Sequence, residues 1–165
     1  MREFVAVLIA AIALLGCNAK TSAKPGAASS ASAPVKQGKP VSAELTGYNH
    51  TDKTIGAFYV NGQWGGNITP GSGGGSFVCC VELPNPWQEG HTVTVTWEDH
   101  EGKMQKREVP VPKYDPKTLS DFNVHFLRSG EIKVFALRFG LRHRDYPLTG
   151  PESELKPGVP IDKVF

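Results

Sequence analysis

The sequence predicts an all-β domain, either an antiparallel β-sandwich or a small open barrel of about seven strands, preceded by a signal peptide and a disordered tether. Three observations support this fold class. From Glu44 onward, apolar and polar residues alternate in short runs, as they do in half-buried antiparallel strands. Gly, Pro, Asn and Asp separate these runs, and helix signals are scarce. The chain of 165 residues has room for one such domain.

The first sixteen residues are predicted to be a lipoprotein signal peptide. Phe4–Leu15 is an unbroken apolar run, too short to cross a bilayer core of about 30 Å but typical of a secretory signal. It ends in Leu14-Leu15-Gly16-Cys17, which resembles the lipobox of bacterial lipoproteins and makes Cys17 the expected lipidation site. The alternative is an ordinary cleavage site followed by an unrelated cysteine. Asn18 after the cysteine favours the outer membrane over the inner membrane.

Residues 17–43 are predicted to be the acylated cysteine and a disordered tether. Ala, Ser, Lys, Pro and Gly dominate this stretch, which cannot bury enough apolar surface to offset its ordering entropy. It carries four lysines and no acidic residue, whereas residues 44–165 hold 13 basic and 15 acidic residues. Because the basic charge lies in the tether and the domain is mildly acidic, no nucleic-acid partner is expected. We expect a lipid-anchored domain that faces the periplasm.

Seven strands are expected between residues 44 and 138. The clearest is His91–Glu98, where three apolar residues share one face and three threonines share the other. Thr54–Val60 leads into Asn61-Gly62, the strongest two-residue hairpin signal. The remaining expected strands are Leu45–His50, Ser76–Leu83, Met104–Val111, Phe122–Arg128 and Glu131–Arg138.

Two segments of residues 44–165 depart from the strand pattern. Asp115-Pro116 predicts a single helical turn, because Asp caps helices and Pro suits the first helical position. The C-terminal stretch contains Pro147, Pro151, Pro157 and Pro160. We expect it to lie extended over the domain.

Cys79 and Cys80 are adjacent in an expected strand, so their side chains point to opposite faces. Their Cα atoms are about 3.8 Å apart across a trans peptide, closer than the usual disulfide range of about 4.4–6.8 Å. A vicinal disulfide therefore requires a distorted turn, yet an oxidising periplasm disfavours two free thiols. Both states remain open. A redox or nucleophilic role is not expected, because no His or Lys lies nearby in sequence to activate a thiol.

The segment Gly62–Gly75 contains seven glycines. It lacks the endings of a phosphate loop or a dinucleotide-binding turn. The segment is expected to be a long loop, either with a purely structural role or as a recognition surface. In the second case, Trp64 and Asn67 are the expected contact residues, together with Gly73 and Gly74 at the close-packed glycine run.

No catalytic constellation is apparent, and the protein is not expected to be an enzyme. There is no Gly-x-Ser-x-Gly elbow and no Ser-His-Asp order. Metal-ligand spacings such as CxxC or HxxxH do not occur, so no metal and no cofactor is expected. If the chain were nevertheless a hydrolase, substitutions of His50 and His125 would be the first test.

Several sequence strings resemble a family of small proteobacterial lipoproteins defined only as a domain of unknown function. They are Gly47-Tyr48-Asn49-His50-Thr51, Val60-Asn61-Gly62-Gln63-Trp64-Gly65-Gly66-Asn67, Gly73-Gly74-Gly75, Cys79-Cys80, Val124-His125-Phe126-Leu127 and Asp145-Tyr146-Pro147-Leu148. Together they span nearly the whole domain. The Trp-Gly-Gly-Asn and Cys-Cys strings are the most specific.

The resemblance implies an immunity lipoprotein, because members of that family are often encoded beside antibacterial phospholipase effectors of type VI secretion systems. Such a protein binds the secreted lipase in the periplasm and blocks it. The alternative is an envelope structural or assembly lipoprotein that binds peptidoglycan or another envelope protein. The resemblance supplies no functional residues for either role.

Overall fold

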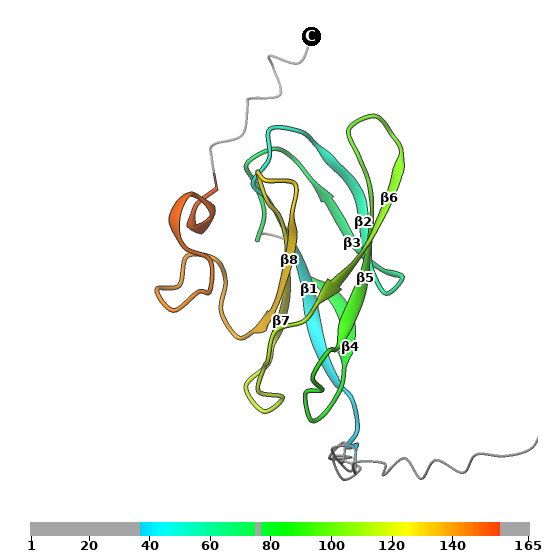
Figure 1. Cartoon of the computed structure of the whole chain (residues 1–165), viewed down its shortest axis with the longest axis vertical. Coiled ribbons are helices and arrows are strands. Elements are labelled where there is room, and N and C mark those ends of the chain that lie inside the picture. The colour runs from blue at the N-terminus through cyan, green and yellow to red at the C-terminus, as the bar shows by residue number, and fades with distance from the viewer. Residues whose placement is uncertain (1–36, 75–76, 156–165) are drawn as a thin grey trace, which may run out of the picture. The chain divides into compact units, whose positions relative to one another are not determined.

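The computed structural model describes residues 37–74 and 77–155. The expected signal peptide, Cys17 and most of the expected tether lie outside these residues. The described part is all-β, with eight strands in two four-stranded sheets (Figure 1). None of its helices is long and apolar enough to cross a membrane.

The two sheets form a β-sandwich, which confirms the predicted fold class. Sheet A has the strand order β4-β1-β7-β8 and sheet B the order β3-β2-β5-β6. The strands of sheet A are β1 (Val41–Asn49), β4 (Val78–Leu83), β7 (Asp121–Phe126) and β8 (Ile132–Leu137). Those of sheet B are β2 (Ile55–Val60), β3 (Gln63–Ile68), β5 (Thr92–Glu98) and β6 (Met104–Pro110). Alternate apolar residues of both sheets fill the space between them, as the period of two requires.

Besides shifts of one or two residues at several strand ends, the start of the domain and the segment at Asp115 differ from the sequence-based prediction. β1 begins at Val41, before the domain start predicted at Glu44, because its first residues pair with the end of β4. Asp115 begins a hydrogen-bonded turn but no helix, since the Thr118 amide donates to the Asp115 carbonyl at 3.1 Å and the chain then continues to β7.

The sheets are not purely antiparallel. β1 and β7 run parallel, with Thr46 opposite Asn123 and Tyr48 opposite His125. All other pairs in both sheets are antiparallel. The parallel pair brings together two segments that are far apart in the sequence, at the centre of sheet A.

β3 is an eighth strand, in a segment that was expected to be loop. Gly65 faces inward, where a Cβ atom would lie 2.2 Å from the Phe58 ring, so only glycine fits there. Gly65 and Gly66 lie at a β-bulge opposite Phe58. Gly66 has a positive φ of 107°, and its outward side is open. The glycines that suggested a loop are therefore what allows this strand to pack closely against β2.

Residues 139–155 cover the outer face of sheet A, and we call them the C-terminal cover (Figure 1, orange to red). They contain turns and the short 3₁₀ helix η1 (Gly150–Ser153), so the prediction of an extended stretch is wrong for this part. Leu141, Tyr146 and Leu148 are buried against Tyr48 of β1 and Phe135 of β8. This second apolar cluster lies on the opposite side of sheet A from the main core.

Candidate functional site

One candidate site is an exposed apolar surface at the edge strands β3 and β4. We define the Trp64 surface as Gln63, Trp64, Phe77, Cys79 and Cys80. The side chains of Trp64 and Phe77 are 48% and 53% exposed. Cys79 and Cys80 are joined by a vicinal disulfide, with Cys79 exposed and Cys80 half-buried. Two large apolar residues exposed at edge strands are an unusual feature for a solvent-facing edge.

Turn geometry and side-chain hydrogen bonds fix the hairpin that carries Trp64. Asn61 and Gly62 both have positive φ, 50° and 85°, as a type I′ turn requires. The Asn61 side chain accepts a hydrogen bond from the Thr94 amide at 2.8 Å, which ties the turn to β5. The Gln63 side-chain amide donates to the Cys79 carbonyl at 2.8 Å and so links β3 to β4. Trp64 is thus presented by backbone that hydrogen bonds tie to β5 and to β4.

The other expected contact residues lie beside this surface. Asn67, Gly73 and Gly74 line a shallow hollow of about 310 Å³, which Trp64 does not line. A Cβ atom on Gly73 would lie 2.4 Å from the Gly47 carbonyl oxygen, and the Gly74 amide donates to that oxygen at 3.1 Å. The two glycines therefore allow the loop to approach β1, whereas Asn67 and Trp64 are exposed.

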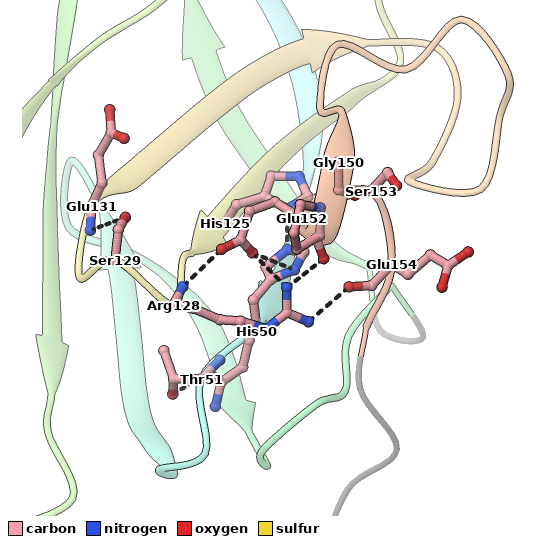
Figure 2. A network of polar contacts seen from close by, with 12 residues as sticks. His50, Thr51, His125, Arg128, Ser129, Glu131, Gly150, Glu152, Ser153 and Glu154 are labelled. Atoms are coloured by element: carbon pink, nitrogen blue, oxygen red, sulfur yellow. Dashed lines mark hydrogen bonds and ion pairs between the residues drawn. The ribbon is translucent and has the colours of Figure 1, made fainter.

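A second candidate site is a buried polar network between sheet A and the C-terminal cover (Figure 2). Parallel pairing of β1 and β7 places His50, just after β1, next to His125. His50 Nε2 and His125 Nδ1 are 2.9 Å apart, and both residues are almost completely buried. The other ring nitrogen of His125 bonds to the Tyr146 hydroxyl. His50 Nδ1 lies 3.2 Å from Glu152 Oε2, although the two atoms are not well aligned for a hydrogen bond.

Arg128 holds the cover end of this network. Its guanidinium bonds to the carbonyls of Pro151 and Glu154, and it lies 3.2 Å from the Glu152 carboxylate. The Arg128 amide also donates to Glu152, at 3.2 Å. Figure 2 shows the Arg128 side chain reaching across to Glu152 and Glu154. The arginine thus fixes the carboxylate that faces His50.

The environment keeps both imidazoles neutral near pH 7. Burial lowers the pKa of His50, partly offset by Glu152, and burial together with His50 lowers the pKa of His125 well below its usual value. Burial raises the pKa of Tyr146, so its hydroxyl keeps its proton. We assign the protons from the contacts: Tyr146 donates to His125, His125 donates to His50, and His50 points its proton at Glu152.

In the sequence, His50 and His125 belong to two of the strings that resemble the family, and they are the first residues to test for hydrolase activity. The structure brings them together, but with Tyr146 and Glu152 they form a closed chain of contacts rather than an open site. Within the described residues, no group of three or more His, Cys, Asp or Glu side chains is placed to hold a metal ion. The period-2 signal around His125 was visible in the sequence, whereas its partners in the cover were not.

The comparisons agree with the sequence resemblance at the level of the family. A family model described as "Protein of unknown function (DUF3304)" matches residues 48–134, more than half of the chain. The matched region contains both histidines, Trp64 and the cysteine pair, and it ends before the C-terminal cover. No curated protein and no solved structure matched. The chain therefore belongs to the DUF3304 family.

Proposed function

We propose that this protein is a lipid-anchored binding protein of the bacterial envelope that recognises a protein partner through the Trp64 surface. The partner we propose is a secreted type VI lipase effector, which would make the chain its immunity protein. The observation that supports the binding role is the exposure of Trp64 on a hairpin whose conformation is already fixed. The identity of the partner rests on the sequence resemblance.

The chemistry of the Trp64 surface suits protein recognition. Tryptophan contributes more binding energy than most residues when a partner buries it, and binding costs less when the contact residue is preorganised. The Asn61–Thr94 and Gln63–Cys79 hydrogen bonds supply this preorganisation. Phe77, which is 53% exposed, and the exposed Cys79 of the disulfide add apolar surface on β4 and the residue before it, and Gln63 links β4 to the strand that carries Trp64. A surface of this kind blocks an enzyme by covering its active site and needs no catalytic group.

The test is a binding and inhibition assay with the product of the neighbouring gene, which the proposal expects to be a lipase. The unmodified chain should form a tight complex and abolish lipase activity. Trp64→Ala should weaken binding by about 2 kcal/mol, roughly 30-fold in Kd. Met104→Ala is the matched control, because Met104 is 61% exposed on β6, the other edge strand of sheet B.

The outcomes separate the proposed roles. Equal affinity of Trp64→Ala and the unmodified chain, with the fold intact, would remove the Trp64 surface from the proposal. A complex that leaves lipase activity unchanged would reject the immunity role. Co-sedimentation of the chain with purified peptidoglycan, without any lipase complex, would instead support the envelope structural role.

A further inference from the structure

The outer face of sheet A has the residue pattern of a water-facing surface, yet it is covered. Alternate residues of β1 and its end are Thr46, Tyr48 and His50, and those of β7 are Asp121, Asn123 and His125. All except Asp121 are buried. The apolar contacts to the cover are confined to one cluster around Tyr48 and Phe135. A polar face of this kind can be hydrated at little cost, so it is compatible with an uncovered state.

The polar link between this face and the cover depends on proton positions. Two of its members, His50 and His125, belong to sheet A, and the other two, Tyr146 and Glu152, belong to the cover. With neutral imidazoles, each contact has one donor and one acceptor. One added proton on His50 would keep each contact paired if His125 carried its remaining proton on Nε2 toward Tyr146, but burial disfavours that charge in the closed state. A second added proton places two N–H donors opposite each other across the 2.9 Å contact.

The charged and titratable groups around the histidine pair do not compensate for two positive charges. β1 contributes Tyr48, which stacks on His125 with ring centroids 4.5 Å apart. The second residue after β7 is Arg128, which is itself cationic and lies close enough to lower the pKa of His50. The remaining groups are Asp121 of β7, Lys133 of β8 opposite His125, and Glu152 and Glu154 of the cover. Of these, only Glu152 makes an ionic contact with the pair, and Arg128 already shares it.

We propose that the C-terminal cover is an acid-released lid, which separates from the outer face of sheet A when His50 and His125 both take up a proton. The released state hydrates both imidazolium groups and frees Tyr146 from His125. It also uncovers Tyr48 and Phe135, while the main core between the sheets stays intact. The switch is built from the contact between two elements, and the Trp64 surface takes no part in it.

The direction of the pH response follows from the burial of the pair. In the closed state the pKa of each histidine lies below its usual value, whereas in the open state each returns to about 6.5. The open state therefore binds more protons as pH falls below about 6.5, and the closed state is favoured above it. With two protons taken up, the opening equilibrium changes on the order of 100-fold per pH unit below that point.

Hydrogen exchange of the full-length chain tests this proposal. Amide protection is measured at pH 7.5, 6.0 and 5.0 and corrected for the intrinsic exchange rate. Protection of residues 139–155 should fall on the order of 100-fold between pH 6.0 and 5.0, while β5 and β6 keep their protection. In His125→Gln only one histidine of the pair remains, so the same change should be about 10-fold. His143→Asn removes an exposed histidine of the cover and should leave the response unchanged.

A second measurement does not depend on any variant folding. Imidazole ¹⁵N shifts of the unmodified chain should show His50 and His125 becoming protonated in the same pH range in which the cover loses protection. The proposal is overturned if protection of residues 139–155 is constant from pH 7.5 to 5.0. It is equally overturned if β5 and β6 lose protection together with the cover, or if His143→Asn abolishes the response.

Discussion

Replacing Gly65 by alanine tests whether close packing against Phe58 is what shapes β3. The added Cβ would lie 2.2 and 2.3 Å from two carbons of the Phe58 ring, much closer than such atoms approach in proteins. Phe58 is fully buried and packs edge-on against Phe126. The ring therefore cannot move aside without disturbing the core. We expect Gly65→Ala to lower the free energy of unfolding by about 1–3 kcal/mol, as overpacking does.

A double-mutant cycle separates this clash from a general effect of alanine in the strand. Phe58→Leu removes the ring atoms that would meet the new methyl group, so Gly65→Ala should cost less in the Phe58→Leu background. We expect a coupling energy of about 1 kcal/mol or more. Gly66→Ala is the matched control, because its Cβ meets open space and its cost comes from the positive φ of 107° alone. It should show no coupling to Phe58→Leu.

Urea unfolding followed by tryptophan fluorescence gives these free energies, provided that the m-values of the variants agree. The packing argument fails if Gly65→Ala is as stable as the unmodified chain within 0.5 kcal/mol, a bound of about the size of neutral surface changes. It also fails if Phe58→Leu leaves the cost of Gly65→Ala unchanged.

Three further predictions concern the buried network and the cysteine pair. Tyr146→Phe leaves a ring nitrogen of His125 without its donor, so it should lower the free energy of unfolding by about 1–3 kcal/mol. Calorimetry measures this change, and an unchanged Tm would contradict the assigned contact. Stability against urea should fall as pH decreases below about 6.5, because the lowered pKa of His125 in the folded chain makes the unfolded chain bind more protons than the folded chain. His125→Gln should flatten this pH dependence. A pH profile identical to that of the unmodified chain would show that His125 is not its cause. Replacing Cys79 and Cys80 together by serine should lower the free energy of unfolding by only roughly 1 kcal/mol, because the loop that the disulfide closes is very short. Mass spectrometry of the unreduced, alkylated chain should find neither of these two cysteines modified.

The sandwich could be predicted because its strands alternate strongly between apolar and polar residues. β5 and β6 lie within one residue of their predicted ends. β3 could not be recognised, since its glycines are typical of loops and only the Phe58 ring on the neighbouring strand explains them. The parallel pairing of β1 with β7 leaves no local signal in either strand.

The candidate sites were predictable to different degrees. Trp64 was singled out because an aromatic residue in a glycine-rich segment is conspicuous, and the structure places it 48% exposed, which leaves its role as a contact residue a prediction. The buried network was missed because its members come from segments that no sequence pattern connects. Polar residues alternate with apolar ones along β7, a pattern typical of a strand with one solvent-facing side. The cover that buries them follows β8 as a proline-containing segment with no strand or helix periodicity.

The parallel pairing in sheet A has a consequence for the order in which the chain can fold. Thr46 and Asn123 face each other although 77 positions separate them, so this contact closes a long loop and carries a corresponding entropic cost. A chain that is synthesised N-terminus first can complete sheet B as soon as β6 has appeared. β1 must wait with one edge unpaired until β7 arrives. The interval of synthesis between β6 and β7 is therefore when a chaperone that binds exposed strand edges would protect this protein most.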